Sequence, residues 1–318
     1  MTSPSARADI ALPEWLAIAL VTGTSGAVLV LEILATRVMA PYVGANLETY
    51  TAIIGTILAG IAVGARVGGR LADEHDPRLL VTGFLVVGGA LAIASIPTVR
   101  LLGGTAGADQ VGLPSVFLAA AGFLPSATVL SAIPPAVVKL QLRDLDRTGD
   151  VVGRLSAWGT GGAIAGTFLA GFVLVAYAAV STLIIGTGVV LIVAGIAFAF
   201  TSRSADPRHF AVAVPLAALG TVGYVAFDTP CDVQSSYYCI AIVDDSDRPG
   251  GQTLVLDDLR HSYVLAGDPT HLEFWYVRQI VGAIDALAPA GPLDVVTIGG
   301  GAMTVPTHLD ATRPGTVN

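Results

Sequence analysis

The chain has 318 residues, of which 53% are hydrophobic and only 13% are charged, and its formal net charge is −8. A soluble domain carries about 25% charged residues, so this composition excludes an ordinary soluble protein and indicates a membrane protein. Half of the 24 acidic groups fall in residues 228–318 beside only four arginines. Such a segment repels phosphate groups, which argues against nucleic acid as a partner.

Seven apolar runs follow one another along residues 1–227, each with the roughly 17–25 residues that a membrane-crossing helix needs. They lie at 15–36, 50–70, 79–99, 113–138, 156–178, 181–201 and 209–227. We therefore predict a membrane domain of about seven transmembrane helices in the lipid bilayer. Pro134 and Pro135 predict a kink or a break in the fourth run. Glycines four residues apart predict close helix contacts; they are Gly60, Gly64 and Gly68, and Gly162 and Gly166.

The orientation follows from lysine and arginine, which are retained on the cytoplasmic side. The connections on the N-terminal side hold ten of these residues and the opposite connections hold two. The ten are Arg7, Arg66, Arg70, Arg78, Lys139, Arg143, Arg147, Arg154, Arg203 and Arg208, and the two are Arg37 and Arg100. This predicts a cell-membrane protein with a cytoplasmic N-terminus and, after seven crossings, a C-terminal tail outside.

The two cysteines, Cys231 and Cys239, lie close together after the last run. Disulfides persist in oxidising compartments, so a bridge between them agrees with a tail outside. On one straight strand the two residues would be ~26 Å apart, whereas a disulfide needs about 4.4–6.8 Å between Cα atoms. A disulfide therefore requires a turn between Asp232 and Ser236. The alternative is a pair of free thiols in a cytoplasmic tail, reached by six or eight crossings.

After Phe227 the pattern changes to that of an α/β domain. In the region 228–268, the β-branched and aromatic runs 236–243 and 253–258 flank DDSDRPGGQ and predict a β-hairpin. In the region 269–318, residues 270–287 have the spacing of a helix face. A strand at 294–298, a glycine turn and a helix start then follow, which is the beginning of a Rossmann (methyltransferase-like) domain that is incomplete in this chain.

The order of these motifs resembles the spermidine synthase family of polyamine aminopropyltransferases, in particular its members fused behind a multi-span membrane domain. The tail has an S-x-Y-x-x-I strand, an L-x-L-D turn and an I-G-G-G loop. The segment LEILATRVMAPYVGANLETYTAIIGTILAGIAVG, residues 31–64, is similar to one that the membrane-fused members carry. The resemblance implies transfer of an aminopropyl group from decarboxylated S-adenosylmethionine, or a related nucleoside, to a small cationic amine, without a metal.

The resemblance also assigns residue roles. Gly299, Gly300 and Gly301 match the cofactor loop. Asp257, His261 and Glu273 fall in the substrate site, although His261 stands where the family usually has glutamine, and Met303 and Asp258 stand where it has glycine. The family's ribose-binding acidic residue and its catalytic aspartate lie beyond the position of Asn318. The resemblance therefore identifies a chain truncated within the first Rossmann unit, and we expect these 318 residues to be inactive alone.

Structural interpretations of the same residues stay open. Asp257 and Asp258 are also typical of a solvated turn, and His261 of an exposed surface. Glu273 is also typical of a helix N-terminus, where the helix dipole favours acidic groups. A second class of function is open as well: a multi-pass transporter, channel or sensor whose tail binds a ligand. No feature of the sequence predicts the oligomeric state.

Overall fold

The computed structural model describes residues 12–104, 112–142, 147–202 and 207–318, except for the side chains of 207–210. The chain divides into two compact units, Met1–Thr229 and Pro230–Asn318. Of the arginines that predict the orientation, Arg7, Arg143 and Arg203 lie outside the described residues, as does the side chain of Arg208.

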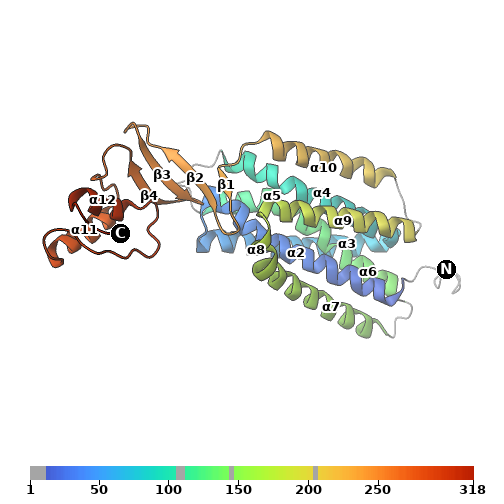
Figure 1. Ribbon diagram of the computed structural model, residues 1–318. Helices are drawn as coiled ribbons and strands as arrows, with labels where there is room; N and C mark the ends of the chain where they lie inside the picture. Colours follow the sequence, from blue (N-terminus) through green and yellow to red (C-terminus); the bar gives the residue numbers. More distant parts are fainter. Residues whose placement is uncertain (1–11, 105–111, 143–146, 203–206) are drawn as a thin grey trace, which may run out of the picture. The chain divides into compact units, whose positions relative to one another are not determined.

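Six helical segments of the first unit are long and apolar enough to cross a membrane, judged by length and composition. Figure 1 shows them running roughly along one direction. They are α2 (Glu14–Val43), α3 (Leu47–Glu74), α4 (Pro77–Gly103), α5 (Leu113–Ser131) with α6 (Ile133–Gln141), α7 (Thr148–Phe168) with the π-helix η2 (Leu169–Leu174) and α8 (Val175–Tyr177), and α9 (Val180–Ser202). The chain is thus a multi-pass helical protein of the membrane type, as its composition predicts.

The seventh predicted span coincides with α10 (Pro207–Ala226), whose apolar part with described side chains, Ala211–Ala226, is shorter than the other six segments. Arg100 of α4 holds the end of this helix. Its Nη1 donates to the carbonyl oxygens of Tyr224 at 2.6 Å and Phe227 at 3.0 Å, and its guanidinium lies 4.5 Å from the centre of the Tyr224 ring. The last carbonyl groups of a helix have no N–H donors within the helix. The Arg100 guanidinium supplies donors for them here.

Small residues bring α3 against α5, and α2 against α7, as the glycine spacing predicts. A Cβ atom added to Gly60 would lie 2.8 Å from the Cβ of Ala127. One added to Gly26 would lie 2.9 Å from the carbonyl oxygen of Gly162. Real Cβ atoms do not approach so closely, so these helix contacts depend on glycine.

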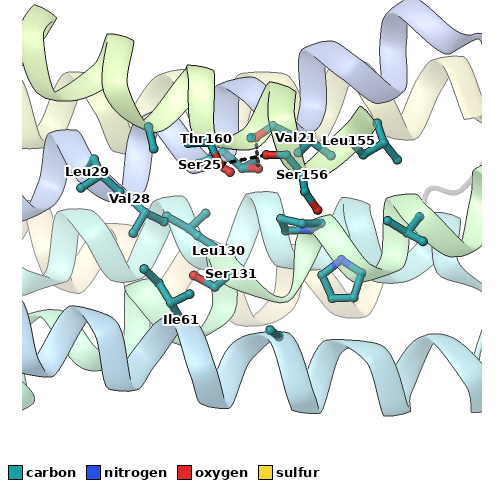
Figure 2. A pocket seen from close by; sticks show the side chains of 17 residues that line it. Val21, Ser25, Val28, Leu29, Ile61, Leu130, Ser131, Leu155, Ser156 and Thr160 are labelled. Atoms are coloured by element: carbon teal, nitrogen blue, oxygen red, sulfur yellow. Dashed lines mark hydrogen bonds between the residues drawn. The ribbon is translucent and has the colours of Figure 1, made fainter. Parts of the chain in front are cut away.

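The fourth predicted span is broken, as Pro134 and Pro135 predict. Helix α5 ends at Ser131, and α6 begins at Ile133, so both prolines lie in the first turn of α6. Proline fits that turn, but it has no N–H to donate to the carbonyl four residues earlier. A cavity of about 440 Å³ lies at this break, lined by residues of α2, α3, α5, α6 and α7 (Figure 2).

The second unit contains a four-stranded antiparallel sheet in the order β1-β2-β3-β4. Its strands are β1 (Val233–Gln234), β2 (Cys239–Asp244), β3 (Gly251–Leu256) and β4 (Leu259–Leu265). The predicted hairpin corresponds to β2 and β3, which pair with Ile242 opposite Leu254. Strands β1 and β4 were not predicted from the sequence, so the hairpin region is a larger sheet than predicted.

Two helices follow the sheet, α11 (Trp275–Leu287) and α12 (Thr304–Thr312). Helix α11 begins at Trp275 and not at Thr270, because Thr270 is held in a turn. Its backbone N–H and its hydroxyl donate to the carboxylate of Asp268 at 3.0 and 2.6 Å. Val277 and Val281 form the buried face of α11.

The strand predicted at 294–298 is not formed as a regular strand. Asp294 makes only an isolated parallel bridge with Val317, and the Val295 N–H donates to the carbonyl oxygen of Val317 at 2.8 Å. Val296 and Ile298 are 91% and 97% exposed. A strand of a parallel sheet is buried between neighbours, and the described part of the chain contains no such sheet around 294–298. The predicted Rossmann sheet is therefore absent from these residues, although the glycine turn and the following helix are present.

Candidate functional site

Tyr263 of β4 joins three segments of the second unit. The side chain is buried, with 1% exposure. Its hydroxyl donates to Oδ2 of Asp245 at 2.8 Å, in the turn between β2 and β3. Its carbonyl oxygen accepts from the hydroxyl of Thr304 at 2.9 Å, at the start of α12. Its ring meets that of His271 edge-on at 5.6 Å between centroids. Tyr263 therefore connects the turn between β2 and β3, the start of α12 and the segment before α11.

Glu273 lies just before α11 and is contacted by two arginines and a histidine. Its Oε2 accepts from Nη1 of Arg248 at 2.6 Å and lies 3.2 Å from Nε2 of His271. Its Oε1 lies 3.7 Å from Nη2 of Arg260. The hydrogen bond from Arg248, followed by that from His271, lowers the pKa of the Glu273 carboxyl. Glu273 is thus an ionised group whose charge is compensated by the protein itself.

The same contacts affect the neighbouring groups. The hydrogen bond to Glu273 raises the pKa of the Arg248 guanidinium. The backbone N–H of Asp247, and then the Tyr263 hydroxyl, lower the pKa of Asp245, whereas burial raises the pKa of Tyr263. Each shift favours the charge state that these groups already have at neutral pH. We refer to these residues as the Glu273 cluster: Asp245, Arg248, Arg260, Tyr263, His271 and Glu273.

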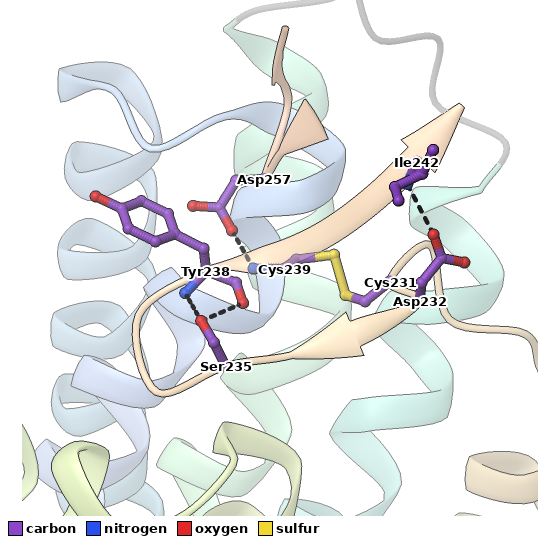
Figure 3. Close-up of a disulfide and its surroundings, with 7 residues drawn as sticks. All are labelled: Cys231, Asp232, Ser235, Tyr238, Cys239, Ile242 and Asp257. Carbon is purple, nitrogen blue, oxygen red and sulfur yellow. Dashed lines mark hydrogen bonds between the residues drawn. A yellow bond between two sulfur atoms is a disulfide. The ribbon is translucent and has the colours of Figure 1, made fainter. Parts of the chain in front are cut away.

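Asp257 occupies the turn between β3 and β4 with φ 58°, in the left-handed region that aspartate tolerates better than most residues. Its Oδ1 accepts from the backbone N–H of Cys239 at 2.9 Å, and its own N–H donates to the Cys239 carbonyl at 2.8 Å (Figure 3). Asp257 therefore fixes the turn to β2. The neighbouring Asp258 is exposed.

Cys231 and Cys239 form a disulfide with 5.1 Å between their Cα atoms (Figure 3). The turn that this bridge requires lies at Ser235–Tyr238, slightly later than predicted. The Ser235 hydroxyl accepts from the Tyr238 N–H at 2.8 Å. On the other side, Oδ2 of Asp232 accepts from the N–H of Ile242 at 2.7 Å. The bridge thus closes β1 onto β2 at the beginning of the sheet.

The predicted substrate residues are not all brought together. Among the described residues, the side chains in contact with the Glu273 carboxylate are Arg248, Arg260 and His271. Asp257 is engaged with β2. His261 is exposed on β4, and its carbonyl oxygen accepts from the hydroxyl of Tyr276 at 3.4 Å.

The glycine turn has left-handed backbone at all three positions: φ is 87° at Gly299, 109° at Gly300 and 56° at Gly301. The turn is fixed to β4 because the Ala302 N–H donates to the hydroxyl of Ser262 at 3.1 Å. A Cβ atom on Gly301 would overlap that hydroxyl, whereas one on Gly299 would meet nothing within 4 Å. Gly301 therefore packs against β4, whereas Gly299 faces open space.

This turn fits a ligand that needs close approach to the backbone. Three successive glycines place no side chain over the backbone, although the Gly300 carbonyl oxygen already accepts from the Met303 N–H at 2.8 Å. Helix α12 begins directly after Met303, without a side-chain cap. The residues that would hold a nucleoside here are Gly299, Gly300 and Gly301. As for metals, no group of three His, Cys, Asp or Glu side chains able to hold an ion occurs in the part of the chain that the structure describes.

Arg248 and Tyr263 were not predicted as site residues from the sequence. The alternation of polar and apolar residues in HSYVL, after the turn at Asp257, was a usable signal for β4 and so for a buried Tyr263. Arg248 carried no signal, since it lies in a turn and reaches Glu273 only in the folded chain. No protein-family model matches this chain, and no curated protein or solved structure matches it either.

Proposed function

We propose that this chain is a membrane-anchored, spermidine synthase-like protein whose second unit binds an adenosyl nucleoside at the Gly299–Gly301 turn. The observation that carries the proposal is the turn itself. Its three left-handed glycines lead directly into α12, and the Ser262 hydroxyl fixes them to β4. Glycines in this position let a ligand approach the backbone closely at the start of a helix.

The proposed reaction is aminopropyl transfer. Decarboxylated S-adenosylmethionine supplies a carbon that is activated by its sulfonium group. The lone pair of the amine nitrogen attacks that carbon, so that a C–N bond forms while the C–S bond breaks and its electron pair stays on sulfur. The products are 5′-deoxy-5′-methylthioadenosine and a substituted ammonium, which loses a proton to a base.

Glu273 supports a cationic amine as the acceptor. Its lowered pKa keeps the carboxylate ionised at neutral pH. Arg248 engages Oε2 at 2.6 Å, whereas the arginine beside Oε1, Arg260, is 3.7 Å away. An ammonium group would therefore bind on the Oε1 side and share the carboxylate with Arg248.

We further propose that α10 crosses the membrane, so that the N-terminus is cytoplasmic and the second unit lies outside. Two features support this orientation. The ten-to-two distribution of lysine and arginine favours it, and the Cys231–Cys239 disulfide belongs in an oxidising compartment.

The nucleoside site is tested by titrating 5′-deoxy-5′-methylthioadenosine into the full chain in lipid nanodiscs, with calorimetric detection. We expect saturable binding that Gly299→Ala weakens about tenfold or more, since a left-handed φ costs an L-residue roughly 1–2 kcal/mol. Gly267→Ala is the matched control, because Gly267 also has a positive φ, 88°, and open space around it. Unchanged affinity in Gly299→Ala would assign the turn a structural role only.

A transporter, channel or sensor is the second candidate, and one observation favours it. The break between α5 and α6 lines a cavity inside the first unit. Discontinuous helices are a recurrent feature of transporter binding sites. The nucleoside titration also separates the two candidates, because a transporter with an unrelated tail predicts no binding at the glycine turn.

A further inference from the structure

The cavity at the helix break contains three serine hydroxyls from three different helices: Ser25 of α2, Ser131 of α5 and Ser156 of α7. Figure 2 shows Ser131 between Ile61 on one side and Ser25 with Thr160 on the other. Ser131 is buried, with 8% exposure. Within the described part of the chain, none of these three hydroxyls has a hydrogen-bond partner. Ser25 is half-buried and Ser156 is exposed, so Ser131 is the one buried serine of the three. All three hydroxyls line the cavity and can donate to or accept from a bound molecule.

The threonines of the same cavity behave differently. Thr24 donates to the carbonyl oxygen of Leu20 at 2.7 Å, and Thr160 donates to that of Ser156 at 3.0 Å. Hydroxyls in helices normally bond back to their own helix in this way. Pro135 has no N–H, so the carbonyl oxygen of Ser131 lacks its usual helical donor and is another group that can accept a hydrogen bond. Hydrogen-bonding groups of α2, α5 and α7 therefore remain available in the cavity.

The remaining lining excludes a charged ligand. None of the seventeen lining residues is ionisable. The other large side chains are aliphatic: Val21, Val28, Leu29, Ile61, Leu130, Val138 and Leu155. A charge placed among them would be unpaired at a very high cost. This cavity consequently does not fit a polyamine, a phosphate or an amino acid.

We infer that this cavity binds a neutral, lipid-soluble molecule with an apolar body and a hydroxyl or carbonyl group, which the three serines recognise. Its volume of about 440 Å³ lies within the range of small-molecule sites. The molecule enters sideways between α3 and α7, where Ala65, Ser156 and Thr160 are exposed. The inference concerns the first unit only and does not depend on the proposed nucleoside site.

The test uses farnesol, a neutral isoprenoid alcohol, as the probe and the full chain in nanodiscs. Tritiated farnesol should bind saturably, with one site per chain. Farnesene, which lacks the hydroxyl, should compete about tenfold more weakly or worse, since one lost hydrogen bond of about 1.4 kcal/mol is a factor of ten. Farnesylamine, which is cationic at neutral pH, should not compete. Competition by all three with equal strength, or no saturable binding, would overturn the inference.

Variants locate the site. The triple variant Ser25→Ala, Ser131→Ala, Ser156→Ala should lose about tenfold or more in farnesol affinity, and Ala65→Phe should block the entrance. Ala157→Phe is the matched control, because Ala157 is also exposed on α7 but does not line the cavity. Thermal unfolding without farnesol checks that each variant folds. Parent-like affinity in both the triple variant and Ala65→Phe would refute a site at this cavity.

Discussion

Glu273 is held by two arginines and a histidine, and these contacts are formed by residues that are far apart in the sequence or share no motif. Arg248 and Arg260 are about half exposed, at 46% and 53% of their side chains. Exposed ion pairs are screened by salt and contribute little individually. Their effect here is geometric, because Arg248 links the turn between β2 and β3 to the segment before α11.

Acidification should loosen the segment between β4 and α11. The folded-state pKa of Glu273 is lowered, so its stabilising contribution is fully present above the unfolded pKa of about 4.3 and is lost as the pH falls through the lowered value. We expect hydrogen-exchange protection of residues 266–274 to fall below about pH 4 in the parent, and to fall less in Glu273→Gln, which lacks this titration.

Asp258→Asn is the control for that experiment, because Asp258 is exposed in the turn between β3 and β4. The Asp258→Asn variant should show the same loss of hydrogen-exchange protection with falling pH as the parent. If hydrogen-exchange protection fell equally with pH in the parent and in Glu273→Gln, the Glu273 carboxylate would not stabilise the segment between β4 and α11.

At the scale of elements, glycine decides how closely the membrane helices pack. A Cβ atom on Gly64 of α3 would overlap the carbonyl oxygen of Thr128, and a backbone atom cannot move aside. On the same helix, Gly55 has nothing within 4 Å. We expect Gly64→Ala to destabilise the first unit by about 1–3 kcal/mol through overpacking.

Gly55→Ala, the matched control, should leave stability unchanged or raise it by up to ~1 kcal/mol, since alanine is the better helix former. Thermal unfolding of both variants in one detergent measures the difference. A Gly64→Ala variant as stable as Gly55→Ala would show that α3 and α5 are not in close contact.

The helices and the break were predictable because their signals are local. Apolar length defines the spans, and Pro134 with Pro135 defines the break, without reference to any other part of the chain. The strand at 294–298 was predicted wrongly for the opposite reason. Its β-branched residues favour a strand, but a parallel strand also needs neighbours, and only Val317 pairs there among the described residues.

The candidate site was predictable only in part. The glycine turn follows from sequence, because three adjacent glycines after an apolar run point to left-handed backbone. The Glu273 cluster did not follow, because Arg248 and Glu273 are brought together only when the chain folds. The unpartnered serines of the cavity were equally hidden, since Ser25, Ser131 and Ser156 lie on three helices and share no motif.

At the scale of the whole molecule, the proposed orientation predicts where the cysteines react. In intact cells, an impermeant maleimide should label Cys231 and Cys239 after reduction and not before it. Gly149→Cys, combined with Cys231→Ala and Cys239→Ala, is the control, because position 149 is exposed at the start of α7 on the predicted cytoplasmic side. It should react only with a permeant maleimide. Labelling of the native cysteines by the permeant reagent alone would place the second unit in the cytoplasm.

Hydrogen exchange over the Gly299–Gly301 turn decides whether the second unit binds a nucleoside. The full chain in nanodiscs is compared with and without saturating 5′-deoxy-5′-methylthioadenosine. We expect increased protection of the amides from Gly299 to Thr304 and no change at the turn around Gly267, which shares the left-handed backbone. Unchanged exchange from Gly299 to Thr304, with or without protection elsewhere in the chain, would contradict a nucleoside site at this turn.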